Sequence, residues 1–170
     1  MENDRLTESA REQLDRVLSF FPRVDALSSV VLGVDVGMLA LLANSILPPK
    51  TFDWRIVFAA AAIVLIGLSL IHLYKGSFPR LDGGWHSLIY FREIAQRNEA
   101  DFIKEFSAQR DEDYTNDLLS QVWRNSEILT QKFDHLKRAF YFLAWAVIPW
   151  AVALAVFSSQ SADTAAKVAK

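Results

Sequence analysis

The sequence predicts an all-α membrane protein, because apolar stretches long enough to cross a bilayer fill much of a 170-residue chain that is 52% hydrophobic. Residues 56–74 and 139–157 contain no Asp, Glu, Lys or Arg, and residues 26–48 contain a single acid, Asp35. A helix rises about 1.5 Å per residue, so roughly 20 residues cross about 30 Å of hydrocarbon. We therefore expect three transmembrane helices. Their expected spans are about 26–48, 55–75 and 138–158.

The first 24 residues are expected to form a cytoplasmic amphipathic helix. Apolar side chains recur there at helical spacing. They are Leu6, Ala10, Leu14, Val17 and Phe21. Pro22 fits the first turn of the next helix, where its missing N–H costs nothing, or it kinks one continuous helix.

Residues 25–75 are predicted to form a transmembrane helical hairpin, because only the short loop 47–54 separates the first two spans. Phe52 and Trp54 are placed to anchor that loop at the outer interface.

Residues 76–137 are expected to be a cytoplasmic insert for sensing or oligomerisation. Residues 75–84 are rich in turn formers, and residues 87–95 fit either a short strand or the start of a helix. Residues 98–109 are typical of a short helix. The last helix is expected to begin at the acids of residues 111–113, which suit a helix N-terminus.

A seven-residue pattern runs through this last helix and into the third span. We name its two rows here. The first row is Leu119, Ser126, Phe133, Phe140 and Val147, and the second row is Val122, Leu129, Leu136, Leu143 and Trp150.

Such a pattern is typical of helices that pack along a seam. The pattern predicts one helix from about residue 112 to 157, roughly 70 Å long, so the insert is continuous with the last span. The two rows either pack within their own subunit or also mediate homo-oligomerisation. Pro149 is a potential kink, and residues 159–170 are expected to be an external tail.

The orientation follows from Lys and Arg near the ends of the spans. They are concentrated before the first span, after the second and before the third: Arg11, Arg16, Arg23, Lys75, Arg80, Arg92, Arg124, Lys132, Lys137 and Arg138. The other side has only Lys50, Arg55, Lys167 and Lys170. A multi-pass membrane protein with a cytoplasmic N-terminus is the expected arrangement.

Several classes of function are disfavoured by composition. The chain has no cysteine, and its three histidines are far apart in sequence without ligand spacing, so neither a metal nor a cofactor is expected. No glycine-rich phosphate loop or acid–base pair suggests an enzyme. Residues 76–138 hold nine Lys and Arg against eleven Asp and Glu, which is no electrostatic footprint for a nucleic acid.

Asp35 is the most conspicuous residue within the spans. A charged Asp at the centre of a spanning helix costs about 2.5–3.5 kcal/mol on insertion scales, so it requires a partner, a proton or water. Ser29, Gly33 and Gly37 form a row of small residues that permits close helix approach. Gly33 and Asp35 are about 200° apart around a helix, so we expect them to face different neighbours. Asp35 has either a packing role, hydrogen bonded as a neutral acid, or a gating role.

Two stretches of the chain resemble the transmembrane effectors of bacterial pyrimidine-cyclase antiphage (Pycsar) systems. The first, residues 24–35, is similar to the family's Asp-Ala-Lys followed by a Leu-Gly-Val-Asn-type span, with Leu27 in place of Lys and Asp35 in place of Asn. The resemblance covers most of residues 24–157. The second stretch comprises residues 88–91, Tyr114, Asp117, Gln121, Ser126, Ile128, Lys132 and Phe133.

The resemblance implies a function. A partner cyclase makes cyclic UMP or cyclic CMP during infection, and the effector binds that nucleotide and impairs the inner membrane, which causes abortive infection. About 80 cytoplasmic residues make a marginal core, so the nucleotide is expected between subunits or between the N-terminal helix and residues 85–135. The candidate ligand contacts are Arg92, Tyr114, Arg124, Asn125 and Lys132.

Three alternatives remain open at this point. A membrane scaffold that binds a cytoplasmic protein without a small ligand would show the same helices and stripe. An effector of a related system would have two spans and respond to a different cyclic oligonucleotide. An ion-coupled transporter is disfavoured, because three spans offer no inverted repeat.

Overall fold

The computed structural model describes residues 2–45, 55–78, 84 and 86–168, with side chains for 3–45, 56–78, 84 and 86–157. Within those ranges all the regular structure is helical, which confirms the predicted all-α class. Three of the helices are long and apolar enough to cross a membrane. The helices are α1 (Glu2–Leu18), α2 (Phe21–Ser45), α3 (Arg55–Ser77), α4 (Phe91–Gln96), α5 (Glu99–Ala108) and α6 (Asp111–Val168).

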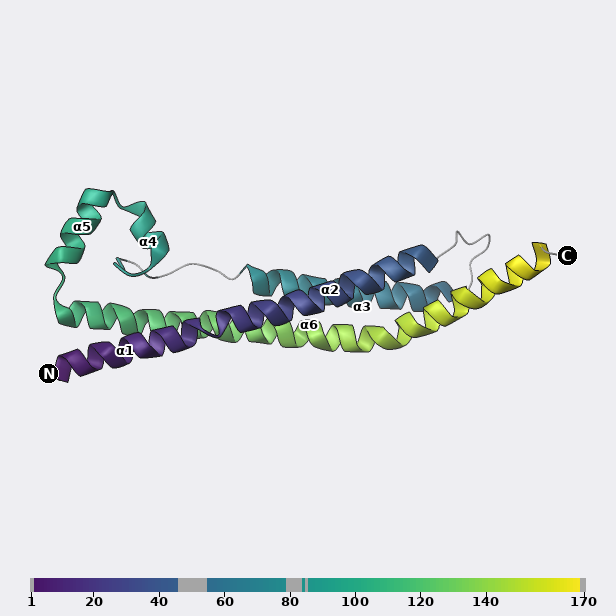
Figure 1. Ribbon diagram of the computed structural model, residues 1–170, viewed down its shortest axis with the longest axis horizontal. Helices are drawn as coiled ribbons and strands as arrows, with labels where there is room; N and C mark the ends of the chain where they lie inside the picture. The colour runs from purple at the N-terminus through teal and green to yellow at the C-terminus, as the bar shows by residue number, and fades with distance from the viewer. Residues whose placement is uncertain (1, 46–54, 79–83, 85, 169–170) are drawn as a thin grey trace. The chain divides into compact units, whose positions relative to one another are not determined.

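The chain divides into two compact units. We call residues 1–24 and 79–132 the hydrophilic unit, and residues 25–78 and 133–170 the membrane unit. Figure 1 shows α6 as one long helix, and its two halves belong to different units. The helix continues through Pro149 and ends at Val168.

The membrane unit packs α2 and α3 against the second half of α6. Small residues on α6, such as Ala139 and Ala146, are fully buried and let Val31, Met38 and Ile66 approach closely. Apolar packing of this kind, with small residues at the contact, is how helices associate in a membrane. The indole Nε1 of Trp150 donates a hydrogen bond to the Met38 carbonyl oxygen at 3.0 Å, which ties α6 to α2.

The hydrophilic unit packs α1 against the first half of α6. Ala10 and Leu14 of α1 and Leu118 of α6 form its buried apolar cluster, with Val122 at the edge. Ala10, Leu14 and Val17 are buried as the amphipathic pattern predicts, whereas Leu6 is exposed.

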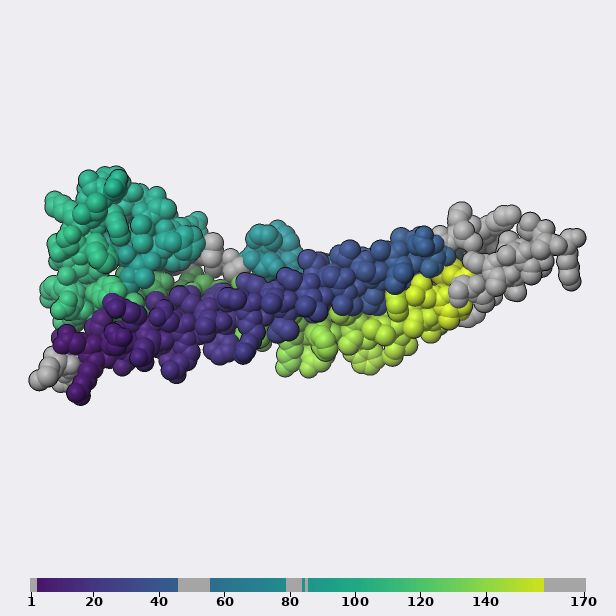
Figure 2. All heavy atoms as spheres, in the orientation of Figure 1, coloured from purple at the N-terminus to yellow at the C-terminus, as the bar shows by residue number. Residues whose placement is uncertain are grey.

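The short helices α4 and α5 lie beside the start of α6, as the teal and green atoms of Figure 2 show. The Asn98 side chain caps α5 by accepting from the Asp101 N–H at 2.9 Å. Arg97 Nη1 donates to the carbonyl oxygens of Ser87 and Glu93, and Arg97 Nε pairs with Glu105 at 3.0 Å.

The boundaries settle several sequence expectations. Pro22 lies in the first turn of α2, after a turn at Ser19 and Phe20, so the chain forms two helices rather than one kinked helix. The ambiguous stretch 87–95 enters a helix only at Phe91. The helix expected over 98–109 is α5. The external loop 47–54, with Phe52 and Trp54, lies outside the described residues.

Candidate functional site

The two heptad rows of α6 have different environments. Leu143 of the second row is buried and Leu136 and Trp150 are half-buried, all within the membrane unit's core. Every apolar member of the first row is exposed. The second row therefore packs within its own subunit, and the first row is left for lipid or for another chain. The exposed members of the first row are Leu119, Phe133, Phe140 and Val147.

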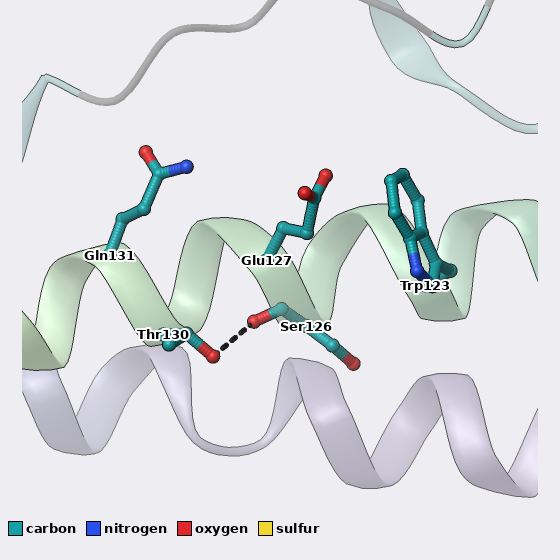
Figure 3. A pocket seen from close by; sticks show the side chains of 5 residues that line it. All are labelled: Trp123, Ser126, Glu127, Thr130 and Gln131. Carbon is teal, nitrogen blue, oxygen red and sulfur yellow. Dashed lines mark hydrogen bonds between the residues drawn. The ribbon is translucent and has the colours of Figure 1, made fainter.

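An open depression of about 340 Å³ lies on the exposed face of α6 in the hydrophilic unit. Figure 3 shows Trp123, Glu127 and Gln131 pointing to the same side of the helix. Ser126 and Thr130 lie nearer the purple N-terminal segment, and the Thr130 hydroxyl donates to the Ser126 carbonyl oxygen at 2.9 Å. An indole beside a carboxylate and an amide offers a stacking surface for a planar ring with hydrogen-bonding groups at its edge.

Tyr114 and Lys132, two of the predicted ligand contacts, already contact α1 and the start of α2 within the hydrophilic unit. The Tyr114 hydroxyl accepts a hydrogen bond from Arg11 Nη2 at 3.3 Å, and this bond raises the pKa of the Arg11 guanidinium. Lys132 is only 9% exposed, and its ammonium lies 5.6 Å from the centre of the Phe21 ring. Both side chains therefore hold helices together.

Of the remaining three predicted contacts, Arg124 and Asn125 are consecutive on α6, and Arg92 is on α4. Asn125 Nδ2 donates to the Gln121 carbonyl oxygen of its own helix at 2.8 Å. Arg124 is half-buried next to Trp123, and Arg92 is exposed on α4. None of the five predicted contacts lines the depression. Their role in binding stays a prediction.

A polar network holds the loop before α4, and two of its members, Asp117 and Gln121, were named above only as part of the family resemblance. Asp117 Oδ2 accepts from the Ser87 hydroxyl at 3.0 Å and from the Leu88 N–H at 2.9 Å. Gln121 Nε2 donates to the Ser87 hydroxyl oxygen at 3.2 Å. Asp117 and Gln121 are four residues apart on α6, and this spacing of polar residues on a helix face was the available signal.

The same loop carries unusual backbone angles. Gly84 has φ of 79°, and a Cβ there would lie 2.7 Å from Tyr90 Cδ1. Only glycine fits at this close approach. His86 has φ of 63°, a left-handed conformation that residues other than glycine rarely adopt. The hydrogen bonds to Asp117 therefore hold the loop in a conformation that its backbone would not favour alone.

Asp35 is a buried acid in the interior of the membrane unit. It is 0% exposed, and its Oδ2 accepts a hydrogen bond from the Ser69 hydroxyl of α3 at 2.7 Å. Its other oxygen, Oδ1, has no hydrogen-bond partner among the described residues. No sequence signal pointed to Ser69 as the partner.

The small-residue row of α2 faces away from Asp35, as its position around the helix predicted. Ser29, Gly33 and Gly37 are all exposed, and a Cβ added at either glycine would meet no other described atom within 4 Å. The row therefore makes no close helix contact within the described part of this subunit.

Two of the three histidines meet in the membrane unit, although 63 residues separate them. His72 Nδ1 of α3 lies 3.2 Å from His135 Nδ1 of α6, and Phe142 stacks on the His72 ring at 5.5 Å. Among the described residues, no three His, Cys, Asp or Glu side chains come together as metal ligands.

These features define the class of protein: an α-helical membrane protein with three candidate spans and a helical hydrophilic unit. The longest helix, α6, contributes one half to each of the two units. The chain belongs to the Pycsar effector family, because the model of the Pycsar effector protein domain matches residues 9–158. It is therefore a transmembrane effector of an antiphage Pycsar system. No curated protein and no solved structure matches the chain.

Proposed function

We propose that a cyclic pyrimidine nucleotide, cyclic UMP or cyclic CMP, activates this effector and that the activated protein impairs the inner membrane. A partner cyclase supplies the nucleotide during infection, and the outcome is abortive infection. The observation that carries this proposal is the family match, which covers residues of both units. The effector itself has no catalytic role in this scheme.

The depression on α6 is the proposed nucleotide site. Its volume of about 340 Å³ is within the range of small-ligand pockets. The Trp123 indole stacks on the pyrimidine, and Gln131 and Glu127 bond to base or ribose groups. Arg124 does not line the depression, but it is the next residue after Trp123 and is the first proposed cation for the phosphate. Arg92 is the second proposed cation, and Tyr114, Asn125 and Lys132 position the helix that carries the site.

The proposed orientation places the hydrophilic unit in the cytoplasm, where the cyclase releases its product. Cations before the first span and around the third support this orientation, since positively charged segments stay on the cytoplasmic side. Arg16 and Arg23 precede the first span, and Lys137 and Arg138 precede the third.

A second copy of this chain is the proposed occupant of the first row. A groove of about 360 Å³ in the membrane unit is lined by Leu27, Val30, Phe133 and Phe140, so two members of the row form one wall. Leu119 and Phe133 precede the third span, whereas Phe140 lies within it. A partner that covers the whole row must itself enter the membrane at the same level, as a second α6 does.

Co-expression with the partner cyclase tests the proposal in cells. Cells that contain both proteins are expected to lose membrane potential, measured with a voltage-sensitive dye, within minutes of cyclase induction. The matched control is a cyclase with an inactive catalytic site. Loss of potential in both strains would show that the nucleotide is not the trigger.

A scaffold function is the second candidate, favoured by exposed apolar side chains on the short helices. Phe91 of α4 and Ile103 and Phe106 of α5 are all exposed. Exposed apolar side chains of this kind mark protein-binding surfaces. A scaffold would bind no cyclic nucleotide, so direct binding measurements separate the two candidates.

A further inference from the structure

The interior of the membrane unit contains groups that bind and release protons, and the proposed function does not assign them a role. Asp35 and Ser69 are both 0% exposed and are joined by a hydrogen bond of 2.7 Å. Asp35 Oδ1 is buried without a hydrogen-bond partner among the described residues. Acids inside membrane helices are costly, and they mark ion and proton pathways.

The second pair of such groups lies one turn further along α3. His72 follows Ser69 by three residues, or about 4.5 Å along the helix axis, and its Nδ1 lies 3.2 Å from His135 Nδ1. An imidazole binds a proton at one ring nitrogen while it releases another from the second. Lys75, Arg138 and Asp134 are the charged side chains near enough to influence the pair.

A second apolar cluster lies further along α2 than Asp35. Leu42 lies two turns along α2 and packs with Ala59, Ala62, Ala153 and Phe157 in a buried cluster. Apolar constrictions of this kind restrict a pathway because they exclude water, so proton flux through it is low until the cluster separates. We call these two pairs, Asp35–Ser69 and His72–His135, the polar file. It lies within the apolar core of the membrane unit, and the Leu42 cluster lies beyond Asp35.

We infer that the membrane unit conducts protons along this file and that the effector impairs the membrane by discharging the proton gradient. The proton moves from a protonated imidazole of the histidine pair, by way of the Ser69 hydroxyl, to the Asp35 carboxylate, in the direction of the Ser69 O–H···Oδ2 hydrogen bond. The imidazolium N–H bond breaks, Ser69 takes that proton while its own O–H proton passes to Asp35 Oδ2, and no electron is transferred. The inference names the species that crosses the membrane and rests on the proposed function only for the trigger.

Asp35→Asn tests this inference, because asparagine still accepts the Ser69 hydrogen bond but carries no exchangeable acidic proton. The full chain is reconstituted in liposomes with a pH-sensitive dye inside, and a voltage is imposed with potassium and valinomycin. We expect a basal proton flux above that of empty liposomes, raised by cyclic UMP or cyclic CMP. Asp35→Asn is expected to lower the basal flux at least tenfold, and Ser69→Ala to lower it as well.

Asp25→Asn is the matched control, since Asp25 lies on the same helix but is exposed, and it is expected to retain wild-type flux. Equal flux in Asp35→Asn and wild type would overturn the inference, and so would release of a large trapped dye as fast as protons. A wild-type protein that binds nucleotide but passes no protons overturns the inference and leaves the proposed function standing. A basal, Asp35-dependent flux without nucleotide binding supports the inference and overturns the proposed trigger.

Discussion

The membrane unit and the hydrophilic unit are both helical, but different contacts hold their helices together. In the membrane unit, fully buried alanines such as Ala62 and Ala146 let the helices approach, and Asp35–Ser69 is a buried polar contact between α2 and α3. In the hydrophilic unit, Asp117 and Gln121 fix a loop through side-chain and backbone hydrogen bonds. Lipid gives apolar helices no reason to associate except close packing, whereas in water a polar network also specifies a loop conformation.

Removing the polar anchor of the hydrophilic unit is expected to have the largest effect. Asp117→Ala loses both hydrogen bonds to the loop and leaves the Ser87 hydroxyl and the Leu88 N–H without their acceptor. We expect a destabilisation of about 3 kcal/mol, since bonds to a charged group contribute most. Faster amide hydrogen exchange over residues 86–90 measures it. Asn116→Ala, an exposed neighbour, should leave exchange unchanged, and equal exchange in both variants would contradict the anchoring role.

A larger side chain at a buried helix contact of the membrane unit is expected to have the second largest effect on stability. Ala146→Leu forces a larger side chain into a fully buried position and should cost about 2 kcal/mol. Thermal unfolding in detergent measures it. Ala144→Leu, two residues away and exposed, is the control. A similar melting temperature for the two variants would contradict the tight packing of α6 in this unit.

Trp123→Ala tests the proposed nucleotide site in the hydrophilic unit. Loss of a stacking surface should weaken nucleotide binding about tenfold, or about 1.4 kcal/mol. Titration calorimetry measures it, and Trp145→Ala, an exposed tryptophan of the membrane unit, should bind as the wild type does. Unchanged affinity in Trp123→Ala would place the nucleotide elsewhere.

The smallest effect on folding is expected at the unused small-residue face of α2. A Cβ added at Gly33 would meet no other described atom within 4 Å, so we expect Gly33→Leu to change the subunit's own stability by less than about 0.5 kcal/mol. The measurement is the assembled mass in detergent. A lower mass in Gly33→Leu, but not in the exposed control Val34→Leu, would assign this face to an interface between copies. Equal masses would assign it to lipid.

The sequence predicted the membrane unit well because the bilayer imposes a length and a composition on each span. The α5 helix was also predictable, since Asn98 caps it and acids occupy its first turn. The opposed directions of Asp35 and Gly33 followed from helix geometry alone.

Contacts between distant segments were not predictable. Ser69 is one of many small residues in an apolar span, and nothing near it in sequence pointed to Asp35. His72 and His135 are separated by 63 residues and meet only because α3 and α6 pack together. Trp123, Glu127 and Gln131 recur every four residues on α6, and that spacing was a usable signal for the depression.

Titration calorimetry on detergent-purified full-length protein tests the central claim most directly. Cyclic UMP, cyclic CMP, cyclic AMP and cyclic GMP are added in separate titrations. The account predicts saturable binding of one pyrimidine nucleotide and none of the purine nucleotides. Absence of binding by all four, with protein that remains folded, would contradict activation by a cyclic pyrimidine nucleotide.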